Sequence, residues 1–374
     1  MTRTQQTLPA PVRRPCPEPE DAEVTGQGGA GRRGTASGSG RARIRRVLRA
    51  ATRPEPWKRG PVLAVLALLL GLFMLLHAQI TDRGGLGSLV ESFLPWFGLF
   101  VPVLLAGALW RRSASAVVAL LMPVVVWLNL FGGLLGDKSH PAADLTVASH
   151  NVGADNPDPV GTARDLVASG ADVLALEEIT PEARVTYEKE LAEAYPHHAM
   201  GGTVGLWSKL PLSKTRPVDL QQDVGPLADT KPEDVRLADS RALRTTVATD
   251  QGPLAVYVAH LGSVRVVPGT GFATGGRDRN ATALAEAVAA EPNERTVLLG
   301  DLNGTTDDRA LDGLTSRLDS AQDEAGDGFG FSYPAKFPVT RIDQILVRGV
   351  EPTDSWVLPA TGSDHLPVAA GISW

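Results

Sequence analysis

The sequence predicts an α/β sandwich that follows three membrane-spanning helices, and three observations support this prediction. Residues 1–59 show no apolar periodicity, whereas residues 60–136 contain three long apolar stretches. Residues 137–374 alternate short apolar runs with turns rich in Gly, Pro and Asp. Many short strands with a few interspersed helices are typical of an α/β sandwich.

The N-terminal segment, residues 1–59, is rich in Pro, Gly, Ser and Arg, and we expect it to be a disordered cytoplasmic tail. Its second half, from Arg41 to Arg59, is basic. A solvated tail that sets membrane orientation is the simpler interpretation, and attraction to anionic headgroups, worth about 1 kcal/mol per basic residue, is the alternative. Cys16 is the only cysteine, so no internal disulfide can form.

Three apolar stretches follow the tail, and each is close to the roughly 20 residues that cross a bilayer as a helix. They run from Pro61 to about Ile80, from about Ser92 to Trp110 and from about Ala114 to Leu135. Arg111 and Arg112 lie between the last two stretches, and the positive-inside rule places them in the cytoplasm with the tail. We therefore expect a multi-pass protein of the cell membrane with an extracellular domain at 137–374.

The pattern of residues 137–374 predicts eight strands and three helices. The strands are Leu145–Ala148, Val173–Leu176, Gly205–Ser208, Ala242–Val247, Leu254–Val258, Val297–Leu299, Gln344–Val347 and Val368–Ile372. The helices are Pro159–Ser169, Pro181–Ala194 and Asp278–Ala290. No internal repeat, GxGxxG motif or Walker loop is present.

Polar side chains stand at the ends of these apolar runs. They are Asn151, Glu178, His260, the pair Asp301 and Asn303, and the terminal set Asp343, Asp364 and His365. Taken singly, most have an ordinary structural explanation, such as a turn-forming Asn, an acid at a helix start or a structural His. Taken together, all at strand ends, they predict one site in which carboxylates, amides and imidazoles meet.

The spacing of these residues indicates their chemistry. Asp301 and Asn303 are two residues apart on an extended end, which aims a base and its orienting amide the same way. A carboxylate at the end of a buried strand commonly holds a hard divalent cation. Glu177 and Glu178 would point to opposite faces of a strand, so only one of them can be that ligand.

Six stretches match a known family. They are His150-Asn151-Val152, Ala175-Leu176-Glu177-Glu178, Ala259-His260-Leu261-Gly262, Gly300-Asp301-Leu302-Asn303, Arg341-Ile342-Asp343 and Ser363-Asp364-His365-Leu366-Pro367. On these stretches, the region from about 144 to 374 resembles the endonuclease/exonuclease/phosphatase superfamily, whose fold is DNase I-like. The resemblance implies a four-layer α/β sandwich with two inner sheets and cleavage of phosphate esters that depends on Mg²⁺, or on Mn²⁺.

The resemblance also implies roles at the metal. Glu178 would be the main ligand, Asn151 would assist at the metal or the phosphate, and Asp364 would lie near the metal. The sequence departs from common patterns of the family in three places: Glu177 stands where Gln is usual, Gln344 where His is frequent, and Gly153 where a second Asn is frequent. These departures concern metal geometry and substrate choice and remove no main catalytic group.

The remaining implied roles concern water and phosphate. Asp301 would activate water, and Asn303 would position the water or the phosphate. His260 and His365 would bind the phosphate and stabilise its charge, and Asp343 would orient His365. The sequence has no GxSxG motif and its one cysteine lies in the tail, so we expect hydrolysis without a covalent intermediate on Ser or Cys.

The predicted layout of three spans and an exported catalytic domain resembles the VanJ-type branch, associated with teicoplanin resistance in actinomycetes. That resemblance implies action on an isoprenoid lipid pyrophosphate of cell-wall synthesis. Residues 137–374 carry 20 Lys and Arg against 35 Asp and Glu, a formal charge of −15, which disfavours nucleic acid as a partner. The alternatives are an exported nuclease, a phosphodiesterase acting on phospholipids, and a catalytically silent protein that binds phosphate ligands.

Overall fold

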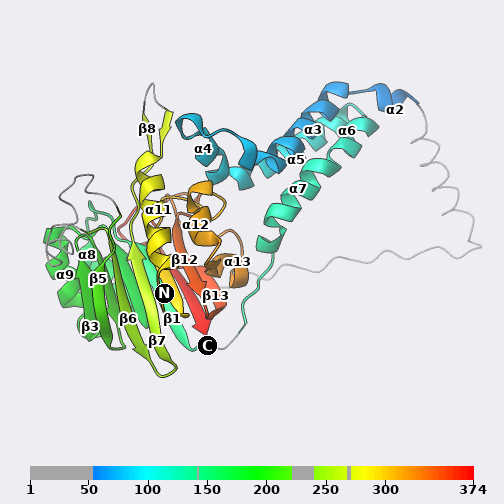
Figure 1. Cartoon of the computed structure of the whole chain (residues 1–374). Coiled ribbons are helices and arrows are strands. Elements are labelled where there is room, and N and C mark those ends of the chain that lie inside the picture. Colours follow the sequence, from blue (N-terminus) through cyan, green and yellow to red (C-terminus); the bar gives the residue numbers. More distant parts are fainter. Residues whose placement is uncertain (1–53, 141–142, 221–239, 268–270) are drawn as a thin grey trace, which may run out of the picture. The chain divides into compact units, whose positions relative to one another are not determined.

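Two six-stranded mixed sheets form the centre of the chain from Leu145 onward (Figure 1). We analysed a computed structural model, which describes residues 54–140, 143–220, 240–267 and 271–374. The first sheet has the order β13 (Glu351–Val357), β14 (Val368–Ser373), β1 (Leu145–Asn151), β2 (Val173–Glu177), β4 (Val204–Ser208), β3 (His197–Gly201). The second has the order β11 (Asp319–Ser320), β12 (Asp343–Arg348), β10 (Thr296–Asp301), β7 (Gly252–Ala259), β6 (Ala242–Thr249), β5 (Leu212–Pro217).

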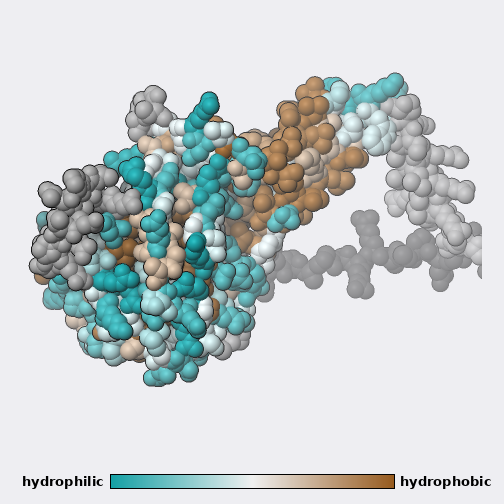
Figure 2. Space-filling model, in the orientation of Figure 1, coloured by the Kyte–Doolittle hydropathy of each residue, from teal (hydrophilic) through white to brown (hydrophobic). Residues whose placement is uncertain are grey.

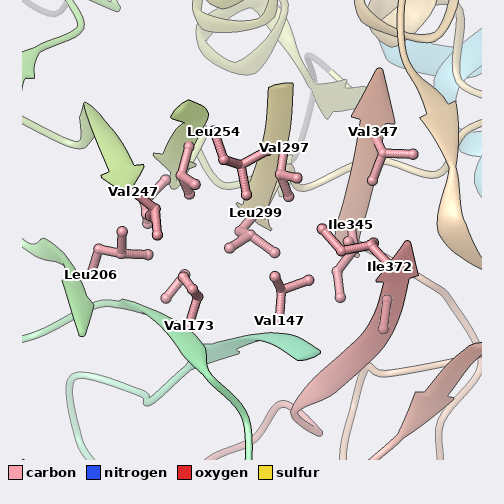
Figure 3. Packing of buried hydrophobic residues seen from close by; sticks show 14 of the residues in the cluster. Val147, Val173, Leu206, Val247, Leu254, Val297, Leu299, Ile345, Val347 and Ile372 are labelled. Atoms are coloured by element: carbon pink, nitrogen blue, oxygen red, sulfur yellow. The ribbon is translucent and has the colours of Figure 1, made fainter. Parts of the chain in front are cut away.

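The two sheets pack face to face through branched aliphatic side chains. Val147 and Val173 of the first sheet lie opposite Leu299 and Ile345 of the second, and these residues are almost completely buried (Figure 3). Strands buried on both faces read as continuous apolar runs in the sequence, which is why the central strands could be predicted.

Helices cover the outer faces of both sheets. On the first sheet, α8 (Pro159–Ala168) and α9 (Pro181–Leu191) bury Leu166 and Tyr187 against Trp207. On the second sheet, α11 (Gly275–Ala289) buries Leu284 against Leu298. The four layers are therefore helix, sheet, sheet and helix, and the predicted four-layer α/β sandwich is confirmed.

The eight predicted strands correspond to β1, β2, β4, β6, β7, β10, β12 and β14, and the three predicted helices to α8, α9 and α11. The prediction missed all four edge strands, β3, β5, β11 and β13. Edge strands lie beside solvent, so polar residues and Pro replace the apolar run: β5 reads LSKTRP and β13 reads EPTDSWV. The β8 (Arg265–Val267) and β9 (Gly271–Ala273) pair and the short helices η6 (Arg309–Leu311), α12 (Asp312–Thr315) and α13 (Ala321–Ala325) were also not predicted.

Strand direction brings the candidate site residues to one end of the sandwich. β1 runs parallel to β2, and β7 runs parallel to β10, so the carboxyl ends of each pair lie together. β14 is antiparallel to β1, and β12 is antiparallel to β10, so the amino ends of β12 and β14 meet those carboxyl ends. Six strand ends, three from each sheet, therefore converge at the same end of the sandwich.

Gly300 allows β10 to approach β7 at this end of the sandwich. Its φ is +149°, and a Cβ at this position would lie 1.9 Å from the carbonyl oxygen of Ala259. Only glycine avoids this clash with a neighbouring backbone. The residue after Gly300 is Asp301 and the residue after Ala259 is His260, so the close approach places these two side chains side by side.

Residues 54–135 form a chain of apolar helices. Its elements are α2 (Pro54–Lys58), α3 (Pro61–Leu75), η1 (His77–Gln79), η2 (Arg83–Gly85), α4 (Leu86–Ser92), η3 (Leu94–Leu99), α5 (Phe100–Trp110), α6 (Ala114–Ala119), α7 (Leu121–Phe131) and η4 (Gly132–Leu134). The predicted disordered tail therefore ends earlier than residue 59, because Pro54 at the first helical position begins a short helix. The rest of the predicted tail, residues 1–53, lies outside the described residues.

The three apolar stretches do not form three uninterrupted helices. Within the described residues, one helix, Ala114–Leu134, is long and apolar enough to cross a membrane. The segments Arg83–Ser92 and Leu94–Trp110 would count as a second span only as a pair bent by 66°. α3 has 15 residues, fewer than the roughly 20 that a span requires. The second stretch breaks at Phe93, ahead of Pro95, which has no backbone N–H to continue the helix.

Candidate active site

The structure brings together the polar side chains that the sequence singled out. Asn151 and Asp301 end β1 and β10, Glu178 and His260 directly follow β2 and β7, Asp343 begins β12, and His365 lies three residues before β14. All of these side chains are buried except Glu178, which is 29% exposed. Asp364 is exposed, and its Oδ1 lies over Gly153 at the rim of the site.

Asp301 lies at the centre of the site and is held by two amides. Its Oδ2 accepts a hydrogen bond from Asn151 Nδ2 at 2.9 Å, and its Oδ1 accepts one from the Asn303 backbone N–H at 2.9 Å. The Asn303 side chain also reaches Asp301 Oδ2, at 3.3 Å, and the carbonyl of Leu261, at 3.2 Å. Asn303 adopts a left-handed φ of +49°, uncommon for a residue with a side chain, and strain of this kind is often found at functional sites.

Asp343 and His365 form a buried hydrogen-bonded pair. His365 Nδ1 lies 2.9 Å from Asp343 Oδ2, which also accepts a hydrogen bond from Ser332 Oγ at 2.6 Å. The ring of Tyr333 packs against His365 with 4.7 Å between ring centroids. Burial disfavours the imidazolium, but the charge of Asp343 and its hydrogen bond outweigh this and raise the pKa of His365 to about 10. His365 is therefore a cation at neutral pH, with Nε2 directed toward Asp301 at 3.8 Å.

His260 is held differently from His365. Its Nε2 lies 2.7 Å from an Arg241 amino group, 3.5 Å from Glu178 Oε1 and 3.8 Å from Asp301 Oδ2. Burial, together with the positive charges of Arg241 and His365, lowers the pKa of His260 well below its usual value. His260 is therefore neutral, and Arg241 supplies the positive charge on this side of the site.

The two adjacent acids lie in different environments. Glu177 is completely buried and accepts a hydrogen bond from Ser149 Oγ at 3.0 Å. Burial, reinforced by the charge of Asp343, raises the pKa of Glu177 well above its usual value and so favours the neutral carboxyl. Glu178 has a left-handed φ of +59°, which turns its carboxylate into the site, where Oε2 accepts a hydrogen bond from Ala154 N–H at 3.0 Å.

The donor set fits a hard divalent cation. Asp301, Asp343 and His365 each place one ligand atom within 4.8 Å of the others. Asp343, however, is engaged by Ser332 and by His365 Nδ1, so we interpret that trio as a hydrogen-bonded pair facing Asp301. The oxygens of Glu178 and Asp301, both within 4 Å of His260 Nε2, offer the hard ligands that suit Mg²⁺ or Mn²⁺ better than zinc.

The electrostatics of Asp301 suit a cation nearby. Burial, and then the charge of Asp343, raise the pKa of Asp301 to about 7, against the opposing effect of His365 and the hydrogen bond from Asn151. Burial and the charges of Asp364, Asp301 and Glu178 likewise raise the pKa of the Tyr333 hydroxyl. Asp364, Asp301 and Glu178 thus all act on the Tyr333 hydroxyl, and a cation near these carboxylates would relieve their repulsion.

Three residues of the site were not predicted from the sequence. Arg241 precedes β6, whose first residue, Ala242, pairs with Ala259, the residue before His260. A basic residue at that place in a neighbouring strand could have been noticed had the pairing of β6 with β7 been known. Ser332 and Tyr333 come from a loop of irregular structure, and the sequence carries no periodic signal for them.

The comparisons with known proteins agree with this geometry. A family model described as the Endonuclease/Exonuclease/phosphatase family matches residues 148–365, more than half of the chain. The chain belongs to this family. Members of the endonuclease/exonuclease/phosphatase family hydrolyse phosphate esters, so the chain has the fold of a phosphoesterase. No curated protein matches the sequence.

Solved structures from several organisms resemble the sandwich. A Bacteroides thetaiotaomicron mannosyl-6-phosphatase is 17% identical, with a TM-score of 0.47, and the match covers 62% of this chain and 100% of that one. D. rerio TDP2 with a single-strand DNA product is 17% identical, with a TM-score of 0.49, and covers 62% and 99%. A Bacteroides vulgatus endonuclease/exonuclease/phosphatase is 16% identical, with a TM-score of 0.49, and covers 62% and 99%. Likenesses at this level add no argument about the substrate.

Proposed function

We propose that this member of the endonuclease/exonuclease/phosphatase family is a membrane-anchored phosphatase that hydrolyses an isoprenoid lipid pyrophosphate. The distribution of exposed apolar side chains carries the proposal. Among the residues that the structure describes, every large apolar side chain that is strongly exposed lies within residues 57–135, except Val185 and Phe337 (Figure 2). Exposed apolar surface on this scale marks contact with a membrane or another protein, and it directly precedes the catalytic sandwich.

The arrangement of the helices supports a cytoplasmic N-terminus and an extracellular catalytic domain. At one end of α3, Gly60 packs against Ser113, so Lys58 and Arg59 lie near the Arg111-Arg112 pair. Beyond the other end of α3, the carbonyls of His77 and Ile80 accept hydrogen bonds from Arg309 of the sandwich. Basic residues thus gather at the end of α3 away from the sandwich, as the positive-inside rule expects for a domain on the outer face.

We assign the catalytic roles as follows. Glu178, with Asp364 at the rim, would hold Mg²⁺ or Mn²⁺, and the cation would supply positive charge to the phosphoryl oxygens. Asp301 accepts a proton from water, and the water oxygen attacks phosphorus in line with the leaving oxygen. Asn151 and Asn303 orient the Asp301 carboxylate through the hydrogen bonds described above.

Positive charge for the transition state comes from two side chains. His365, kept protonated by Asp343, stabilises phosphoryl oxygens from one side. Arg241 does so from the other side, with neutral His260 beside it. This assignment changes the role expected of His260, because its Nε2 faces an Arg241 donor and its lowered pKa leaves it uncharged.

The substrate class follows from charge and location. Residues 137–374 have a formal charge of −15, which repels a polyanion such as nucleic acid at long range. A lipid pyrophosphate carries few charges, and it diffuses in the plane of the membrane that would hold the apolar helices. Anchoring raises the effective concentration of such a substrate at the site. Undecaprenyl pyrophosphate of cell-wall synthesis fits this description, and a role like that of the VanJ-type branch in glycopeptide resistance would follow.

The test is a comparison of two reactions by the full-length protein in detergent with Mg²⁺. We expect release of phosphate from undecaprenyl pyrophosphate to be faster than nicking of plasmid DNA, and both activities to disappear in excess EDTA. Efficient nicking without phosphate release would instead favour the nuclease alternative. Cleavage of a phospholipid phosphodiester alone would favour a phospholipase-type activity, and binding of phosphate ligands without any turnover would favour a silent binding protein.

A further inference from the structure

An apolar cavity of about 400 Å³ lies between the helices of residues 54–135 and the loop of the sandwich that carries Phe329 and Phe331. Small-molecule sites generally have volumes of roughly 300–1,000 Å³, so the cavity can hold part of a long ligand. Within the part of the chain that the structure describes, no charged side chain lines it. The residues that matter for the argument are Trp96, Val124, Trp127 and Leu128 from the helices and Phe329 and Phe331 from the loop.

The polar atoms of the two tryptophans are already satisfied. Trp96 Nε1 donates a hydrogen bond to the Val339 carbonyl at 2.8 Å, and Trp127 Nε1 donates one to the Pro95 carbonyl at 2.8 Å. The indoles therefore present hydrocarbon surface to the cavity. Water would find few hydrogen-bond partners there, whereas an apolar chain needs none.

The aromatic residues join the helices to the sandwich. Phe331 stacks on Trp96 with ring centroids 5.6 Å apart, and Phe329 stacks on Phe331 at 5.2 Å. Phe329 also lies 6.2 Å from Trp127. The wall of the cavity is thus shared between the apolar helices and the domain that carries the active site.

The same loop continues directly into the active site. Ser332, the residue after Phe331, donates a hydrogen bond to Asp343, and the ring of Tyr333 packs against His365. The Cα atoms of Phe331 and Tyr333 lie at most about 7 Å apart, so one short piece of loop supplies both a wall of the cavity and the contact with His365. One ligand with an apolar end and a phosphate end could occupy both.

We propose that this cavity binds the isoprene units nearest the pyrophosphate of the lipid substrate. The inference rests on the proposed function and adds the site that recognises the chain. Leu128 lines the cavity and is 48% exposed on α7, so the cavity opens on the apolar outer surface of the helices. The rest of a long chain can leave by that side, while the phosphate lies at Asp301 and His365.

The test compares two substrates of different chain length, undecaprenyl pyrophosphate and isopentenyl pyrophosphate, which has a single isoprene unit. Val124→Trp fills the cavity, and Val125→Trp is its matched control, because Val125 is on the same helix, exposed and outside the cavity lining. Leu128→Glu is a second variant, which places a charge in the cavity instead of bulk. The measured quantity is the ratio of kcat/KM for the long substrate to kcat/KM for the short one.

We expect Val124→Trp and Leu128→Glu to lower this ratio by roughly tenfold or more, mainly through KM for the long substrate. Loss of burial for two methylene groups alone corresponds to about that factor. Val125→Trp should leave the ratio as in the wild type. An unchanged ratio in both cavity variants, or an equal fall in Val125→Trp, would overturn the inference while leaving the phosphatase proposal intact. No release from either substrate by the wild type would overturn both.

Discussion

Asp301 is the residue on which the proposed chemistry most depends. Asp301→Asn preserves the size of the side chain and removes the base, so we expect kcat to fall by about 10²–10⁴-fold with the fold retained. Phosphate release and circular dichroism of the full-length variant measure the two effects. Wild-type turnover in Asp301→Asn would show that the site has been assigned incorrectly.

Glu177 and Glu178 offer a matched pair of substitutions. Glu177 is buried and its raised pKa favours the neutral carboxyl, so Glu177→Gln introduces a neutral group of the same shape and should keep activity within about threefold, or roughly 0.6 kcal/mol. Glu178→Gln removes the carboxylate that faces the site and should cost at least tenfold, which higher Mg²⁺ would partly restore. Equal losses in the two variants would contradict the assignment of Glu178, rather than Glu177, as the acid that holds the cation.

The pKa values at the site predict a bell-shaped pH profile of kcat/KM. Asp301 must be deprotonated, so activity rises with pH up to about 7, and a bound cation would move this limb to lower pH. His365 must be protonated, so activity falls as pH passes about 10. Asp343→Asn removes the charge that raises both pKa values, and both limbs should therefore move to lower pH. A profile that this substitution does not shift would exclude Asp343 as the residue that tunes the site.

At the scale of elements, a buried ion pair connects α4 and α11 to the loop that carries Asn303. Arg277 on α11 donates hydrogen bonds to Asp308, to Ser88 on α4 and to the carbonyl of Asn303, each at 2.9 Å. Arg277 and Asp308 are almost completely buried. The helical segment and the loop that carries Asn303 are thus held by one guanidinium.

Breaking this ion pair should affect both stability and turnover. Arg277→Gln leaves the Asp308 charge without its partner, which typically costs about 3–5 kcal/mol for a buried pair. We expect a lower unfolding temperature in detergent together with a lower kcat, because Asn303 loses the contact that fixes its carbonyl. Arg279→Gln, on the exposed face of α11, is the control and should change stability by less than about 0.5 kcal/mol. Equal stability of the two variants would contradict this role.

At the scale of the whole molecule, the proposed orientation can be tested with protease. Protease added to intact spheroplasts should remove the domain that follows Gly136, while a tag on the N-terminus stays protected, because basic residues favour the cytoplasmic side. Immunoblots against the tag and against the sandwich measure both. Protection of the sandwich until lysis would mean that the orientation is inverted.

The sequence by itself determined the central layers of the fold and most of the candidate site. Strands buried on both faces must be apolar, so β1, β2, β7 and β10 were visible as runs, and polar residues at their ends stood out. Edge strands such as β5 and β13 face solvent, so the same physical reason made them invisible.

Only the tertiary structure decided which groups meet and in what protonation state. Arg241 reaches His260 through the pairing of β6 with β7, and Tyr333 reaches His365 through an irregular loop. Neither contact has a local signal, because each depends on segments far apart in the chain. The raised pKa of Glu177 likewise follows from complete burial, which the adjacent and chemically identical Glu178 does not share.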